Sequence, residues 1–63
     1  MELKAGHTYK TRDGSREVTV QPVSNGTNYV FCDANAKSEE YTKNGCYFSQ
    51  TVEFSLDLVE LVH

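Results

Sequence analysis

The chain has 63 residues, of which 38% are hydrophobic, 24% charged and 11% aromatic, and its formal net charge is −3. This length predicts one small domain over residues 1–63, and it excludes a multidomain enzyme, a doubly wound nucleotide-binding fold and a TIM barrel. The composition is that of a globular chain. With no apolar run long enough for a membrane span and no recognisable signal peptide, we expect a cytoplasmic protein that has no membrane partner.

Three pairs in which Asp or Asn precedes Gly predict tight turns: Asp13-Gly14, Asn25-Gly26 and Asn44-Gly45. Such pairs suit the two central positions of a type I′ hairpin turn, where the glycine takes a positive φ. Segments rich in β-branched and aromatic residues flank these pairs, which is typical of an all-β domain. The strands expected from this pattern cover residues 7–11, 17–23, 27–32, 40–42 and 46–49.

Four segments carry further expectations. Residues 27–32 are apolar on both faces and are therefore the best candidate for a central strand. Pro22 cannot donate a ladder hydrogen bond, so it should lie at an edge or end the second strand. Residues 34–40 show no alternation and are expected to form a polar loop with room for one helical turn. Residues 55–63 fit either a helix or a strand; we favour a strand, because so short a helix is marginal and a closing strand covers an open edge.

Together these elements predict an all-β fold, a small antiparallel SH3-like barrel of about five strands. We expect a core made of Val18, Val20, Val30, Phe31, Cys32, Phe48, Leu56, Leu58 and Leu61. A core of this size holds only about three or four large rings, whereas the chain has four tyrosines and three phenylalanines. The remaining rings should be partly exposed, and exposed tyrosine is common at interfaces.

The predicted binding residues lie around the first turn and in the third expected strand. Tyr9 and Tyr29 are the leading rings, because each stands beside a polar neighbour, Lys10 and Asn28 respectively, rather than within a fully apolar run. Arg12 and Arg16 flank the first turn and would reach an acidic partner or a phosphate. The alternative is that these charges only solvate an exposed turn and that the rings only pair across a half-solvated sheet.

The sequence offers no catalytic or metal-binding constellation. Cys32 and Cys46 are expected to be reduced thiols that pack like small hydrophobic groups. Together with His7 and His63 their spacing does not match paired zinc ligands, and neither histidine is placed to activate a nucleophile. We therefore expect a protein that is not an enzyme and that uses no cofactor and no metal.

Both ends of the chain resemble small accessory proteins encoded by tailed bacteriophages and prophages. The start carries the motif Gly-x-x-Tyr-x-x-Arg-Asp-Gly over residues 6–14, followed by Val18-Thr-Val20, and the end carries Asp57-Leu-Val59. The middle of the chain is unmatched, and Tyr41 stands where many such proteins carry Trp. The resemblance implies a phage origin, a small β fold and action by binding, and it carries over no catalytic residue.

Three functions agree with these observations. The first is a phage accessory protein that binds and inhibits or sequesters a host factor, such as a component of antiviral defence. The alternative is a small nucleic-acid or nucleotide-binding β-barrel module, including one that holds a signalling nucleotide, although the acidic charge disfavours nucleic acid. The third is a structural role in the virion. For the first two we expect a homo-oligomer in the host cytoplasm, since a small domain gains stability and binding surface by self-association.

Overall fold

A computed structural model describes all residues 1–63. It contains five strands and no helix, and so no helix that is long and apolar enough to cross a membrane. The strands are β1 (Thr8–Thr11), β2 (Glu17–Pro22), β3 (Phe31–Asp33), β4 (Ala36–Tyr41) and β5 (Leu58–Leu61). They form one sheet of order β4-β3-β2-β1-β5 in which every neighbouring pair is antiparallel. The predicted all-β, five-stranded antiparallel fold is confirmed.

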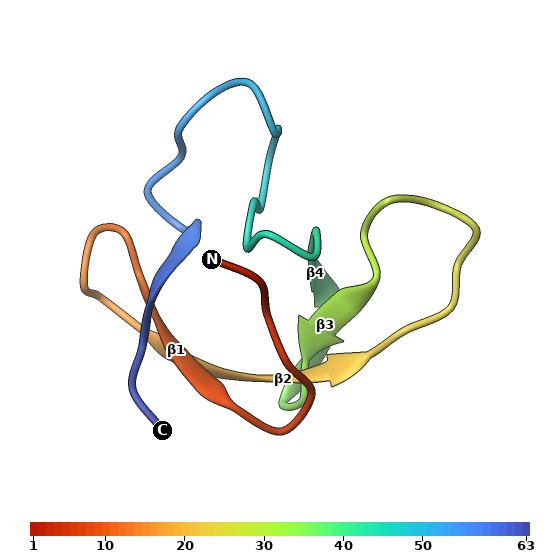
Figure 1. Ribbon diagram of the computed structural model, residues 1–63, viewed down its shortest axis with the longest axis horizontal. Helices are drawn as coiled ribbons and strands as arrows, with labels where there is room; N and C mark the ends of the chain where they lie inside the picture. Colours follow the sequence, from red (N-terminus) through yellow and green to blue (C-terminus); the bar gives the residue numbers. More distant parts are fainter.

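Strand β2 is the centre of the sheet and belongs to both of its halves. Residues 17–19 pair with β1, and residues 20–22 pair with β3. The sheet bends along β2, so that the β1–β5 side and the β3–β4 side face a common interior (Figure 1). The result is barrel-like but not closed. Near the gap between β4 and β5, the amide of Leu58 donates a hydrogen bond of 2.8 Å to the carbonyl of Gly45.

Two of the expected strand assignments hold and one is only partly right. Pro22 is the last residue of β2, as predicted. The segment 55–63 contributes strand β5, which pairs with β1, so the strand interpretation is confirmed over the helix. The segment 27–32 was expected to be central, but only its last two residues enter β3, which lies between β2 and β4.

The polar loop expected at residues 34–40 is wrong, because most of that segment is β4. The chain turns at residues 34–35, where the amide of Asn35 donates to Oδ1 of Asp33 at 2.9 Å. Strand β4 then runs along the sheet edge, where its side chains before the buried Tyr41 are exposed or half-buried. An edge strand with charged side chains resists pairing with other chains, which explains why its sequence lacks an apolar alternation.

The third expected hairpin is also wrong on one side. The turn exists, since the amide of Gly45 donates to the carbonyl of Thr42 at 2.9 Å, but residues 46–49 form no strand and begin a long loop. Type I′ geometry is excluded at every turn, because no residue other than glycine has a positive φ. The positive φ expected at Gly26 and Gly45 is confirmed, at 75° and 92°. Such a glycine commonly follows a tight turn and forms a bulge.

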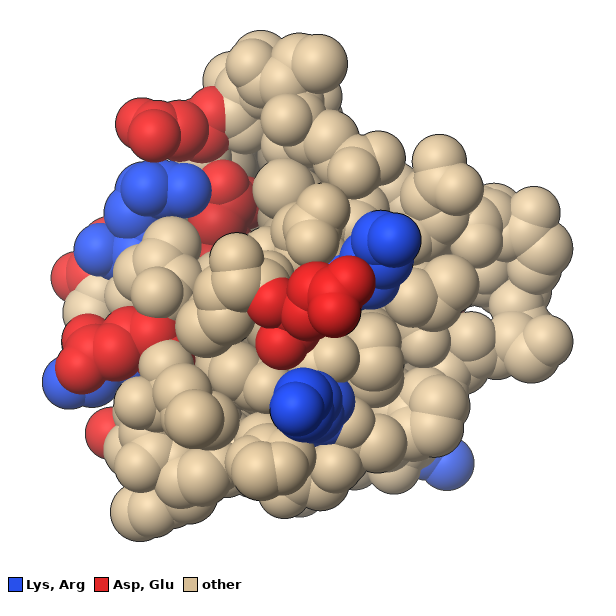
Figure 2. Space-filling model, viewed as in Figure 1, with Lys and Arg blue, Asp and Glu red and all other residues tan.

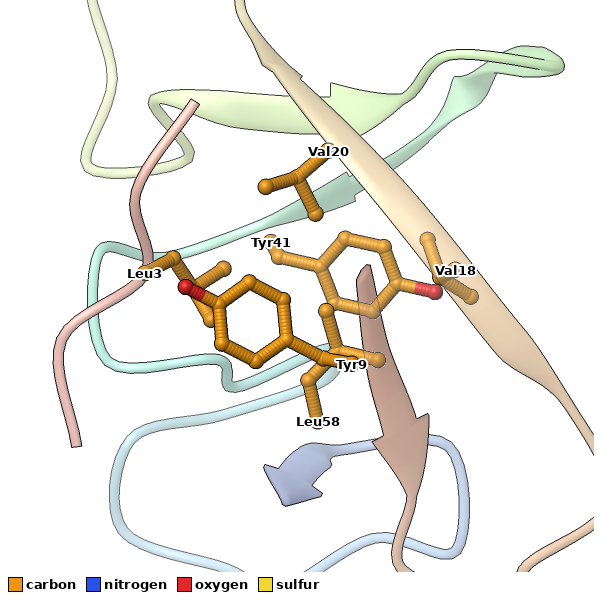
Figure 3. Close-up of a cluster of buried hydrophobic side chains, with 6 residues drawn as sticks. All are labelled: Leu3, Tyr9, Val18, Val20, Tyr41 and Leu58. Carbon is orange, nitrogen blue, oxygen red and sulfur yellow. The ribbon is translucent and has the colours of Figure 1, made fainter. Parts of the chain in front are cut away.

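The core is smaller than predicted and contains different rings. Its main cluster consists of Leu3, Tyr9, Val18, Val20, Tyr41 and Leu58 (Figure 3), and Cys32 is also buried. The prediction is right for Val18, Val20, Cys32 and Leu58, but Phe31 and Leu56 are only half-buried, and Val30, Phe48 and Leu61 are exposed. Two tyrosines and the unpredicted Leu3 take the vacated volume.

Leu3 enters the core because the segment before β1 crosses the interior of the bent sheet (Figure 1). Its amide donates a hydrogen bond of 2.7 Å to the carbonyl of Lys43, which fixes the segment against the turn after β4. This contact brings together residues far apart in sequence, so no local pattern would have indicated it.

Candidate functional site

The four predicted binding residues do not form one site. Tyr9 is only 2% exposed and belongs to the core, so its expected place on the surface is wrong. Its ring packs among apolar side chains while its hydroxyl accepts a hydrogen bond of 2.8 Å from the amide of Lys4. A tyrosine fits a small core when its hydroxyl has such a hydrogen-bond partner. The number of rings in the sequence does not show which tyrosine will find one.

The two predicted arginines are each paired with carboxylates. Arg12 lies 3.3 Å from the buried carboxylate of Asp57 and 3.6 Å from Glu53, and Arg16 lies 3.5 Å from Glu39. Blue and red groups accordingly alternate along one side of the surface (Figure 2). These ion pairs leave no basic platform beside an aromatic ring, which is the arrangement that a stacking nucleic-acid site requires.

Tyr29, which is half-buried, is the predicted residue that contacts the segment carrying the exposed Phe48. Its hydroxyl donates a hydrogen bond of 2.7 Å to the carbonyl of Phe48. This bond joins the loop between β2 and β3 to the loop between β4 and β5. We call the surface formed by residues 23–30 and 46–54 the two-loop surface.

The two-loop surface carries almost no charge. Residues 18–32 and 44–52 include no Asp, Glu, Lys or Arg. In the space-filling view the upper and right-hand parts of the molecule, where these loops lie, are correspondingly a broad uncoloured area (Figures 1 and 2). A surface of this kind differs from the mixture of charges that covers most soluble domains.

Exposed apolar side chains are concentrated on this same surface. The Phe48 side chain is the most exposed large hydrophobic group of the chain, at 64%, and Val52, Val30 and Phe54 are also exposed. The Phe54 ring stacks on Tyr47 with centroids 5.7 Å apart and lies 5.6 Å from Phe48. Interface centres are poor in charge and rich in aromatic residues, so the two-loop surface has the composition of a binding site.

Buried and local hydrogen bonds hold the longer of the two loops in shape. The carboxylate of Asp57 accepts the amides of Tyr47, at 2.9 Å, and Phe54, at 3.0 Å. Tyr47 and Phe54 lie near the two ends of the loop segment 46–54. A loop fixed in this way loses less conformational entropy when it binds a partner.

The shorter loop is organised by one asparagine. Oδ1 of Asn25 accepts the amide of Thr27 at 2.9 Å, and Nδ2 of Asn25 donates to the carbonyl of Tyr29 at 3.0 Å. The same Nδ2 donates to Oε2 of Glu40 on β4 at 3.1 Å. The loop is therefore tied both to itself and to the edge of the sheet.

Two hollows flank the line where the loops meet. The first has a volume of about 310 Å³ and is lined by Tyr29, Ser38, Glu40 and Tyr47. The second has a volume of about 250 Å³ and is lined by Asn28, Val30, Thr42, Lys43 and Gln50. Both hollows contain polar groups beside apolar ones, which is the usual make-up of a site that fixes a ligand's orientation.

Beside the first hollow, Glu39 interacts with two side chains. The Tyr47 hydroxyl donates to Oε2 of Glu39 at 3.0 Å, and this hydrogen bond, with burial, raises the pKa of Tyr47 above its ordinary value. The other oxygen of Glu39 faces Arg16. Both carboxylate oxygens of Glu39 thus have partners within the chain, whereas Glu40 has no cationic partner.

The structure brings together no set of three or more His, Cys, Asp or Glu side chains that would hold a metal ion. The two cysteines are free thiols, Cys32 buried and Cys46 half-buried. Nδ1 of His7 lies 3.1 Å from the carbonyl oxygen of His63. The chemistry available on the surface is therefore that of rings, amides, hydroxyls and carboxylates.

Sequence reasoning missed Tyr47, Phe48 and Phe54 as surface rings and assigned Phe48 to the core. A usable signal was present, namely that the segments around Tyr29 and Phe48 are both free of charge. Comparison with protein-family models, curated proteins and solved structures finds no match. The functional argument accordingly starts from the geometry of the two-loop surface.

Proposed function

We propose that this protein is a binding module that docks on a host protein through the two-loop surface and thereby inhibits or sequesters it. A phage accessory role in the host cytoplasm, with a component of antiviral defence as the target, follows from the resemblance at the two ends of the chain. The observation that carries the proposal is the exposed Phe48 in a surface made by two anchored loops, in which Glu53 is the single charged residue.

Three properties of the two-loop surface support this proposal. Exposed aromatic rings provide contact area at a low cost in side-chain entropy. Apart from Glu53, residues 23–30 and 46–54 carry no charged side chain, which limits the desolvation penalty that charged groups incur when they are buried. The hydrogen bonds to Asp57 and Asn25 prepare the loops for contact before a partner arrives.

The alternative, a nucleic-acid or nucleotide-binding module, has weaker support. Arg12 and Arg16 are each paired with a carboxylate although their side chains are partly exposed, and residues 23–30 and 46–54 contain no Lys or Arg to meet a phosphate group. Neutralisation of phosphates supplies most of the affinity in such modules. A protein partner therefore fits the observed surface better.

The test is capture of host proteins by tagged wild-type protein, compared with Phe48→Ala and with a control change, Leu61→Ala. Both side chains are exposed, but Leu61 lies on β5, outside the two-loop surface. We expect a host protein to be captured by the wild type and by Leu61→Ala, and to be reduced at least about tenfold with Phe48→Ala, as at an interface hot spot. Melting curves of the two variants should match that of the wild type.

A host protein captured equally by all three proteins would contradict the proposal. The proposal would also be contradicted if Phe48→Ala changed the self-association of this protein but not the capture of any host protein. We include a homo-oligomer in the proposal, and light scattering over a range of concentrations measures it. If Phe48→Ala abolishes self-association and no host protein depends on Phe48, the surface joins copies of this chain and the host-binding proposal fails.

A further inference from the structure

The first hollow of the two-loop surface combines two aromatic rings with one carboxylate. Tyr29 reaches it from the β2–β3 loop, Tyr47 from the β4–β5 loop, and Ser38 and Glu40 from β4. Ser38 and Glu40 are two positions apart on one strand, so their side chains project on the same face. Three separate elements therefore converge on a space of about 310 Å³.

Glu40 is a half-buried carboxylate without a cation. The three ion pairs of the molecule involve Glu53, Asp57 and Glu39, and none involves Glu40. Its hydrogen bond comes from the neutral amide of Asn25, which holds the carboxylate in position but does not compensate its charge. A partly desolvated charge of this kind gains most from a cation brought by a ligand.

The tyrosine rings suit the same cation. The face of an aromatic ring attracts an ammonium or guanidinium group within about 6 Å of its centroid. The stem of a lysine or arginine side chain packs on apolar surface while its charged end stays near polar groups. Tyr47 already stacks on Phe54, so we assign the packing of the stem to the ring of Tyr29 and the charged end to the carboxylate of Glu40.

We propose that the hollow lined by Tyr29, Tyr47 and Glu40 receives a lysine or arginine side chain of the bound protein. This inference rests on the proposed function and specifies its partner. Because the Tyr29 hydroxyl bonds to the backbone carbonyl of Phe48, and Phe48 follows Tyr47 in the chain, the hollow lies beside the segment that carries the exposed ring. The partner segment should therefore carry a basic residue close to an apolar residue that contacts Phe48.

The test is an NMR titration of the ¹⁵N-labelled protein with the peptide acetyl-Gly-Lys-Gly-amide. A norleucine peptide of the same length serves as the uncharged probe, and an arginine peptide as the second basic probe. We expect saturable shifts of the amides around Tyr29, Glu40 and Tyr47 for one or both basic peptides, with a Kd no tighter than about 1 mM, since an exposed contact of this kind changes affinity only a few-fold. The norleucine peptide should bind at least about fivefold more weakly, and added salt should weaken only the basic peptides.

Glu40→Gln is the decisive variant, because the amide oxygen of glutamine still accepts the hydrogen bond from Asn25. We expect it to weaken the basic peptides about fivefold. Glu60→Gln removes the same charge from exposed β5 and should leave binding unchanged. Tyr29→Leu keeps an apolar side chain but removes the ring, and we expect it also to weaken binding of the basic peptides.

Equal binding of the lysine and norleucine peptides, or unchanged binding to Glu40→Gln, would overturn the inference. Host capture that depends on Phe48 but not on Glu40 would leave the proposed function standing without this pocket. Peptide binding that depends on Glu40, with no host protein depending on Phe48, would instead leave the pocket and remove the proposed function.

Discussion

Arg12 and Asp57 are joined through both backbone and side chain. The amide of Arg12 donates to the carbonyl of Asp57 at 2.7 Å, and its Nη2 donates to Oδ2 at 3.3 Å. The Asp57 side chain is 4% exposed, whereas that of Arg12 is 40% exposed. Asp57 thus connects the first turn to β5 while it also holds the loop that carries Phe48. Arg12, proposed from the sequence as a binding residue, has a structural role.

Replacement of Asp57 with alanine should destabilise the fold. The amides of Tyr47 and Phe54 would lose their acceptor, and each part-buried donor left unpaired costs about 1–3 kcal/mol. A domain of this size has a total stability of about 3–5 kcal/mol, so we expect Asp57→Ala to be largely unfolded by circular dichroism. Glu53→Ala, which removes the highly exposed partner of Arg12, should change stability by less than about 0.5 kcal/mol.

Alanine at Gly45 should be far more damaging than alanine at Gly26. Both glycines have a positive φ, which costs an alanine about 1–2 kcal/mol. At Gly26 the added methyl group would meet open space, whereas at Gly45 it would lie 2.5 Å from the carbonyl oxygen of Leu58. That overlap should add about 1–3 kcal/mol. Urea midpoints of the two variants measure the difference, and equal midpoints would contradict the close approach of these segments.

Removal of the hydroxyl should have opposite effects at the two buried tyrosines. Tyr9→Phe deprives the Lys4 amide of its acceptor and should cost about 1 kcal/mol. The Tyr41 hydroxyl is buried without a hydrogen-bond partner, so Tyr41→Phe removes an uncompensated polar group and should be neutral or stabilising. Thermal unfolding of the pair tests this, and a loss of stability in Tyr41→Phe would mean that its hydroxyl is satisfied.

Stability should fall at high pH because of Tyr41. Burial, with a smaller contribution from Asp33, raises the pKa of Tyr41 from 10.0 to about 12. Between these values the unfolded chain loses this proton while the folded chain keeps it, so the unfolded state binds fewer protons and stability decreases as pH rises. Below pH 10 the Tyr41 hydroxyl stays protonated in both states, so this loss of stability is absent there. Urea midpoints at rising pH should fall less steeply for Tyr41→Phe, and the raised pKa of Tyr47 leaves a remaining slope of the same sign.

The two thiols should react at different rates. Cys46 is half-buried and Cys32 is 1% exposed, so a thiol reagent should label Cys46 in the folded protein and Cys32 only when the sheet opens. Mass spectrometry of the labelled protein over time measures both rates. Simultaneous labelling of both thiols under native conditions would contradict the burial of β3.

The strands that could be predicted from the sequence are those with a local signal. The β1–β2 hairpin has such a signal in its Asp13-Gly14 turn, where the amide and hydroxyl of Ser15 both donate to Oδ1 of Asp13 and lower the pKa of Asp13. Strand β2 alternates, and Pro22 marks its end. Strand β4 was missed because an edge strand with polar side chains lacks this pattern. Residues 46–49 were misassigned because their rings resemble a strand, although a distant carboxylate at Asp57 determines their conformation.

The candidate site was predictable only in part. The structure places Tyr29 half-buried in the two-loop surface beside the backbone of Phe48, whereas Tyr9, which was expected to accompany it, lies in the core. The two tyrosines have similar local sequence. What separates them is the hydrogen bond between the Tyr9 hydroxyl and the Lys4 amide, a contact that forms only when the segment before β1 folds into the sheet.

The pairing of β5 with β1 has a consequence for how fast this chain folds. A contact that accompanies this pairing, between His7 and His63, links residues 56 positions apart. The β1–β2 and β3–β4 hairpins, by comparison, join neighbouring segments, and local pairings form before distant ones because their loop-closure entropy is smaller. We therefore expect the two hairpins to assemble around β2 in the transition state and β5 to dock after it. Substitutions in β5 should then accelerate unfolding with little effect on the folding rate, whereas substitutions in β2 should slow folding.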